Sequence, residues 1–300
     1  MRNTRSFLFA TFEGGGSVTP ALTVVRELVR RGHRVRMMSD PCNRPESEAA
    51  GAAFVPWTRA PGKAERMREC DTFSDWDAAD AAEGFMMLMD SVLTGPSLAF
   101  AEDVIAELRR EPADLVVSSE MLFGVHAACE AIGQELALLA VNIGLFPIPG
   151  IPPMGPGLAP ARTAEEHAVH AAITRGTMEL LNGRALPALN RARAALGLPA
   201  LTSLVDQHRA ARVLMLATAR AFDFAPAALP PHIAYVGPQL GEPAWAAPWQ
   251  SPFAAGDARP LVLVSFSTTF QNHLGPLQRV IDALATLPVK AVVTLGGSIY

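Results

Sequence analysis

Short apolar runs alternate along the chain with stretches in which apolar residues recur at helical spacing. The first run covers residues 6–12 and the second covers residues 35–38. Between them, the apolar residues of 18–31 fall on one face of a helix. This order of strand, helix and strand predicts a βαβ unit with parallel strands.

The same alternation continues well beyond this unit. Further strands are predicted over residues 52–57, 114–118, 136–141 and 213–217. Helices are predicted over residues 81–110, 123–132 and 163–196, the first broken or kinked at Gly95 and Pro96 and the last kinked at Pro187. We therefore expect an α/β fold whose first part is a doubly wound, Rossmann-like parallel sheet with right-handed crossovers.

Two irregular stretches interrupt this pattern. The proline-rich stretch 146–160 predicts a long loop over the carboxyl end of the sheet, and it serves either as a linker or as the wall of a pocket. The second, 238–259, is rich in Pro, Ala and Trp and marks the best domain boundary. A new strand, helix and strand follow it. We predict a domain over 1–220, a linker over 221–258 and the start of a second Rossmann-like domain over 259–300.

Composition narrows the class of protein. The chain has 300 residues, half of them hydrophobic, so it can bury a sizeable core. A net charge of −4 without a large basic cluster argues against a nucleic-acid partner. Three separated cysteines indicate neither a disulfide framework nor a zinc site. No uninterrupted apolar run is long enough to span a bilayer, which predicts a soluble, cytoplasmic protein without stable membrane insertion.

The glycine run at 14–16, between the first strand and the first helix, has three interpretations. It is an incomplete dinucleotide-binding fingerprint, with Asp40 as the ribose-binding acid. It only permits a tight turn, with Ser17 as the N-cap of the helix. Or the start of the helix faces a cleft and orients a polar or anionic substrate group.

Three motifs carry a resemblance to a known family. The first is Gly16-Ser17-Val18-Thr19-Pro20 followed by LVRRGHRV over 28–35; the others are AFDFAPAALPPHIAYVGPQL over 221–240 and PLVLVSFSTTF over 260–270. In this order and spacing the sequence resembles GT-B glycosyltransferases, in the family 1 branch of macrolide and UDP-glycosyltransferases.

The resemblance implies a hexosyltransferase-type enzyme. Such an enzyme moves a sugar from a nucleotide sugar, a UDP- or dTDP-hexose, to a hydroxyl or amine of a small, largely apolar acceptor such as a natural product. The first domain would bind the acceptor and the second the nucleotide sugar. These two molecules are the expected partners, in a bacterial protein, and neither a cofactor nor a metal is implied.

The catalytic residues implied by the resemblance depart from the family pattern. The family base is a His after the first strand, oriented by an Asp after a later strand; this sequence has Ser17 and Ser119 at those positions, with Glu120 next. Glu120 then acts as the base, directly or through water, while Ser17 positions the acceptor. Alternatively, the acceptor supplies a nucleophilic amine or an acidic phenol. Ser17 as a plain N-cap and Glu120 as a dipole-stabilised carboxylate also remain open.

Binding residues are assigned by the same resemblance. The acceptor site is expected to include Phe85, Met86, Met89, Phe123 and Asn142, although a plain core role also fits the apolar stretch 85–92. The donor phosphate is expected at Ser267, Thr268 and Thr269.

The histidines give no metal site. His33 is expected to serve the turn before the second strand and His126 to lie in the interior. His167 and His170 are expected on a solvated helix face.

The downstream donor motifs of the family do not occur within these 300 residues, so we expect a partial, truncated sequence. The alternative function is a catalytically silent acceptor-binding or accessory protein derived from this family.

Overall fold

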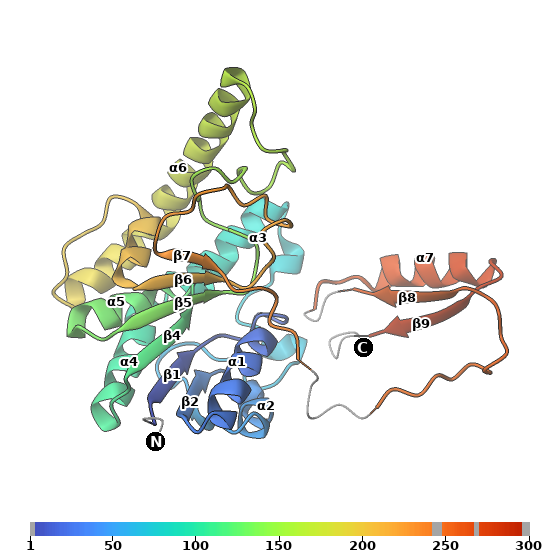
Figure 1. The fold of residues 1–300 in the computed structure, drawn as a ribbon, viewed down its shortest axis with the longest axis horizontal. Helices are drawn as coiled ribbons and strands as arrows, with labels where there is room; N and C mark the ends of the chain where they lie inside the picture. Colours follow the sequence, from blue (N-terminus) through green and yellow to red (C-terminus); the bar gives the residue numbers. More distant parts are fainter. Residues whose placement is uncertain (1–3, 242–247, 267–269, 296–300) are drawn as a thin grey trace.

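The structure is a computed structural model that describes residues 4–241, 248–266 and 270–295. Seven parallel strands form the large sheet, in the order β3-β2-β1-β4-β5-β6-β7 (Figure 1). They are β1 (Ser6–Ala10), β2 (Arg34–Ser39), β3 (Ala53–Pro56), β4 (Leu115–Ser119), β5 (Leu136–Ala140), β6 (Val213–Leu216) and β7 (Ile233–Tyr235). The strand order reverses between β1 and β4, which creates a crevice at their carboxyl ends.

Helices cover both faces of this sheet. They are α1 (Val18–Arg30), α2 (Arg44–Ala49), α3 (Ala81–Leu88), α4 (Ser97–Arg110), α5 (Phe123–Ile132) and α6 (Ala164–Ala195). Short turns are the 3₁₀ helices η1 (Pro41–Asn43), η2 (Arg68–Cys70), η3 (Asp75–Asp77) and η5 (Leu204–Ala210), and the π-helical η4 (Met89–Leu93). The predicted doubly wound α/β fold is confirmed.

Alternation along the strands sends successive side chains to opposite faces. In β1, Leu8 and Ala10 pack in the core beneath α4 and α5, whereas Phe9 packs with Val25 of α1 on the other face. Both faces are apolar because helices cover both sides. This explains why the parallel strands read as continuous apolar runs in the sequence.

The stretch Ala81–Arg110 is long and apolar enough, by composition, to cross a membrane. The structure divides it into α3, the π-helical η4 and α4, with the chain broken at Gly95 and Pro96 as predicted. Gly95 cannot be replaced here because a Cβ would lie 1.6 Å from the carbonyl oxygen of Asp90. Phe100 and Val104 of α4 are fully buried. The α4 part of this stretch is therefore built into the core of the domain.

The domain boundary needs one adjustment. β7 lies inside the range predicted as linker, yet it pairs with β6 and completes the first sheet. A strand of three residues is too short to show a periodic pattern. A second, two-stranded parallel sheet of β8 (Leu261–Ser265) and β9 (Lys290–Thr294) follows, with α7 (Leu274–Ala285) on one side (Figure 1).

Candidate active site

A cavity of about 440 Å³ opens at the carboxyl ends of β1 and β4, where the strand order reverses. Its walls come from the glycine turn after β1, from residues 57–80 between β3 and α3 (the β3–α3 segment), from the ends of β4 and β5, and from the second domain. We call it the main cavity. Its position is the usual place for ligands in open α/β sheets.

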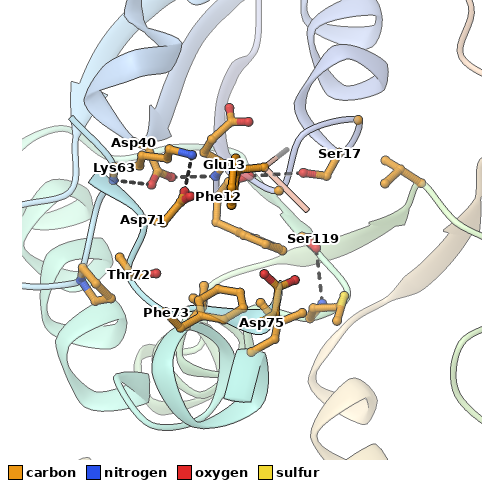
Figure 2. Close-up of a pocket in the computed structure, with 18 of the residues that line it drawn as sticks. Phe12, Glu13, Ser17, Asp40, Lys63, Asp71, Thr72, Phe73, Asp75 and Ser119 are labelled. Carbon is orange, nitrogen blue, oxygen red and sulfur yellow. Dashed lines mark hydrogen bonds and ion pairs between the residues drawn. The ribbon is translucent and has the colours of Figure 1, made fainter. Parts of the chain in front are cut away.

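Ser17 borders the main cavity at the start of α1 (Figure 2). Its hydroxyl donates to the carbonyl oxygen of Phe12 at 3.2 Å and makes no capping hydrogen bond to the helix. The expectation that Ser17 caps α1 with its side chain is therefore wrong. The turn folds back on itself, with Gly15 at φ +70°, and this directs the hydroxyl to the strand end instead.

Ser119 borders the same cavity from the end of β4. Its hydroxyl oxygen accepts the backbone N–H of Met121 at 3.3 Å and donates to Glu120 Oε2 at 3.3 Å. Ser17 and Ser119 also share a smaller recess of about 10 Å³ beside the main cavity. The structure thus brings together the two serines that stand at the family's His and Asp positions.

Glu120 itself does not line the main cavity; it borders a neighbouring cavity of about 270 Å³. Its side chain is buried, and Oε1 has no hydrogen-bond partner among the described residues. Burial raises the pKa of the Glu120 carboxyl to about 7, against the lowering effect of Ser119 and Asn142. Because Ser119 lines the main cavity and Glu120 does not, the Ser119 hydroxyl is what links Glu120 to that cavity.

Two buried histidines hold the backbone at this point. His126 Nε2 lies 2.9 Å from the carbonyl oxygen of Ser119, and His208 Nε2 lies 2.8 Å from that of Glu120. Burial lowers the pKa of His126 to about 3 and that of His208 to about 4, so both rings are neutral at pH 7. Each carbonyl accepts from Nε2–H, which fixes the direction in which Ser119 and Glu120 leave β4.

The opposite wall is a closed polar network. The Asp40 carboxylate accepts the backbone N–H groups of Glu13 at 2.8 Å and Lys63 at 2.7 Å, and Lys63 pairs with Asp71 (Figure 2). Burial raises the pKa of Asp40 to about 6. Since both carboxylate oxygens of Asp40 already bind the protein's own turns, the geometry argues against Asp40 as a ribose ligand. Lys63 is one of two lysines in the sequence. This rarity was the only feature of the sequence that set this wall apart.

Several predicted acceptor residues lie elsewhere. Met86, Met89 and Phe123 are core residues, and Phe85 packs partly buried against them. These expectations are corrected: the face of the stretch 85–92 that carries the methionines turns to the core, and Leu88 and Val92 border the cavity instead. Asn142 does line the cavity, at the end of β5.

The aromatic wall was not predicted. Four aromatic side chains from three parts of the chain line the main cavity: Phe12, Phe73, Trp76 and Phe270. Phe270 and Gln271 belong to the second domain, so the cavity is closed by both domains. The β3–α3 segment has no periodic pattern, and sequence reasoning therefore had no means to place its residues.

The predicted donor residues Ser267, Thr268 and Thr269 lie outside the described residues. The proline-rich stretch 146–160 is a pocket wall away from the main cavity: residues 146–154 border a cavity of about 520 Å³, and residues 146–149 border the one of about 270 Å³. Leu145, just before this stretch, borders the main cavity. His33 Nδ1 accepts the backbone N–H of Arg5 at 3.2 Å and thereby serves the start of β2.

Comparison with known proteins adds to this geometry. The chain is 27% identical over 294 residues to 4′-demethylrebeccamycin synthase of Lentzea aerocolonigenes, covering 96% of this chain and 69% of that protein. A scan of protein-family models finds no match. The glycotransferase of kitacinnamycin superposes with a TM-score of 0.66 at 17% identity, over 98% of this chain and 66% of that one. The fold is that of the GT-B glycosyltransferases.

This confirms the resemblance read from the sequence. The glycosyltransferase VinC, solved in complex with dTDP, has the same GT-B fold, with a TM-score of 0.51 and 15% identity over 96% of this chain and 66% of that one. The chain thus spans about two thirds of the length of these GT-B relatives.

Proposed function

We propose that the protein transfers a sugar from a nucleotide sugar, a UDP- or dTDP-hexose, to a hydroxyl or amine of a small, largely apolar natural product. The observation that carries this proposal is the main cavity itself. It lies at the crevice of a GT-B fold, combines aromatic and aliphatic side chains with polar ones, and is bordered by Phe270 and Gln271 of the second domain. The relatives act as glycosyltransferases, and VinC binds dTDP.

In this proposal the first domain, including β7, holds the acceptor against the aromatic wall. The second domain, of which this chain contains the strand–helix–strand unit over 261–294, contributes to the binding of the nucleotide sugar. Ser267, Thr268 and Thr269 are proposed to contact the donor phosphate, by resemblance alone. A cytoplasmic location fits a fold in which the long apolar stretch is divided into three elements and α4 packs into the core.

The chemistry requires a base that removes the acceptor proton while the acceptor oxygen attacks the anomeric carbon and the nucleoside diphosphate departs. Ser119 and Glu120 supply it as a pair. The acceptor proton passes to Ser119 Oγ as the Ser119 proton passes to Glu120 Oε2 over the 3.3 Å hydrogen bond. A carboxyl pKa of about 7 suits this role, because a base is most effective when its pKa lies near the working pH.

Ser17 is proposed to position the acceptor. The Ser17 hydroxyl donates its hydrogen to the Phe12 carbonyl, and its oxygen lone pairs are left to accept from a second polar hydrogen of the acceptor, because the proton of the reacting group goes to Ser119. Asn142 contributes amide groups to the same part of the cavity.

The test is a transfer assay with the 300-residue chain, UDP-glucose or dTDP-glucose, and a panel of phenolic and amine acceptors. Mass spectrometry would detect the added hexose, and acceptor binding would be measured by fluorescence in parallel. Transfer by the unmutated chain that is lost in Ser119→Ala, but kept in the surface control Glu165→Gln, supports the proposal. Acceptor binding without any transfer, both by this chain and by the same gene read through to any downstream reading frame, would instead identify the catalytically silent, acceptor-binding protein.

A further inference from the structure

An aromatic and cationic cluster joins the two domains at the rim of the main cavity. The rings of Trp76 and Phe270 meet edge to face, with centroids 4.9 Å apart and an interplanar angle of 89°. The guanidinium of Arg68 lies over both rings, 5.4 Å from the Trp76 centroid and 4.8 Å from that of Phe270. Beside them, Gln271 Nε2 donates to Asp75 Oδ2 at 3.0 Å.

The β3–α3 segment that carries this cluster is anchored at its start. Asp103 of α4 accepts the backbone N–H groups of Thr58, Arg59 and Ala60. Further along, Asp40 accepts the N–H of Lys63.

Its far end is anchored as well, because Asp80 caps α3 through the N–H of Glu83 at 2.9 Å. Between these anchors the chain forms the single turns η2 and η3, whose residues are half-buried or exposed, and the pairs of Lys63 with Asp71 and of Arg66 with Glu46 hold its first part. Trp76 follows these pairs, so the contacts of its ring contribute to its position.

Arg68 differs from its neighbours in the cluster because it does not line the cavity. Trp76 and Phe270 do line it, and each comes from a different domain. Arg68 is exposed, so a cation–π contact is its main attachment to the rest of the fold in this arrangement. Such a side chain acts on a ligand only through the two rings that it covers.

We propose that Arg68 is a positioning residue that clamps Trp76 against Phe270 and thereby closes the second domain over the acceptor in the main cavity. The clamp itself is a property of the structure, whereas its effect on an acceptor rests on the proposed function. Trp76 Nε1 is buried without a hydrogen-bond partner among the described residues, so the clamp also presents an unused donor at this wall.

The first test measures the clamp without any ligand. Hydrogen exchange followed by mass spectrometry reports on the amides of Asp77 and Ala78, which bond within η3, and of Leu277, which bonds to His273 at the start of α7. In Arg68→Met, which keeps the apolar stem and removes the charge, these amides are expected to exchange about threefold to tenfold faster. Arg68→Lys keeps a cation and is expected to restore most of the protection.

The matched control is Arg44, whose guanidinium lies 4.7 Å from the Phe54 ring at the far edge of the sheet, outside the main cavity. Arg44→Met removes a cation–π contact of the same kind and is expected to leave the exchange at 77–78 and 277 unchanged. Unaltered exchange in Arg68→Met, or equal losses in Arg68→Met and Arg68→Lys, would overturn the proposal.

The second test uses 4-methylumbelliferone as the acceptor probe with UDP-glucose or dTDP-glucose. Arg68→Met is expected to raise the KM for the probe about threefold to tenfold while kcat changes by less than about twofold. A change in kcat alone would contradict the positioning role. If neither the unmutated chain nor the same gene read through to any downstream reading frame shows transfer while the exchange effect is present, the proposed function fails and the clamp stands.

Discussion

Two walls of the main cavity differ in whether their buried polar groups have hydrogen-bond partners. On one side Asp40, Lys63 and Asp71 satisfy one another or the backbone, so this wall has little hydrogen-bonding capacity to spare. On the other side Ser119 leads to a buried Glu120 with an unpartnered oxygen. A satisfied network stabilises and rigidifies, whereas an unsatisfied buried carboxyl costs stability and marks a place for chemistry. The contrast teaches which acidic residues to test for stability and which for activity.

The largest effect is expected for activity at the unsatisfied wall. Glu120→Gln removes the proton acceptor and should lower kcat about 10²- to 10⁴-fold, the usual contribution of a general base. In the unmutated chain kcat/KM should rise with pH through about 7, because the base must be ionised. The pH–rate profile and steady-state kinetics check this. A Glu120→Gln variant with the unmutated rate and profile would assign the proton transfer to the acceptor itself.

At the satisfied wall the expected effect is on stability. Asp40→Ala leaves the N–H groups of Glu13 and Lys63 without their acceptor and should lower the free energy of unfolding by about 2–4 kcal/mol. Urea unfolding followed by circular dichroism measures the change. Asp282→Asn, at an exposed site on α7, serves as the control and should lie within about 0.5 kcal/mol of the unmutated chain. Equal stability of Asp40→Ala and the control would show that the network is dispensable.

Glu120→Gln should raise the free energy of unfolding, whereas Asp40→Ala lowers it. Because burial raises the folded-state pKa above its unfolded value, the native state loses stability as pH rises from about 4.5 to 7. The neutral amide avoids this cost, so the variant should be more stable by up to about 3 kcal/mol at pH 8, with the difference vanishing below pH 4.5. Urea unfolding of both proteins at pH 4, 6 and 8 measures this difference. A variant that is less stable than the unmutated chain at pH 8 would refute the interpretation that burial of the ionised Glu120 carboxyl costs stability.

The smallest effect concerns the glycine turn. A Cβ on Gly14 would lie 2.9 Å from Cε2 of Phe12 and 3.1 Å from Ser17 Oγ, so Gly14→Ala should shift the Phe12 ring in the cavity. We expect the free energy of unfolding to fall by about 1 kcal/mol and the KM for the acceptor to rise modestly. At Gly16 a Cβ would meet nothing within 4 Å, which makes Gly16→Ala the matched control. Identical kinetics for the two variants would show that the ring position is unimportant.

Some of the site was readable from the sequence. Ser17, Ser119 and Asn142 were assigned from the family resemblance, and the structure brings them to one cavity because residues after parallel strands gather at one edge of the sheet. Of the alternatives for Ser17, side-chain capping was wrong, since a capping hydrogen bond depends on the exact path of the turn. Met86 and Met89 do share a helix face, but nothing in their spacing says whether that face meets the core or the cavity.

The sequence by itself determined the order of strands and helices, the parallel sheet and the GT-B resemblance, because these depend on local periodicity and short motifs. Only the tertiary structure decided the walls of the cavity. The contacts of Asp40 with Lys63, of His208 with Glu120 and of Trp76 with Phe270 join residues far apart in the chain. Such pairs form when packing brings irregular segments together, and irregular segments carry no periodic signal from which a contact can be predicted.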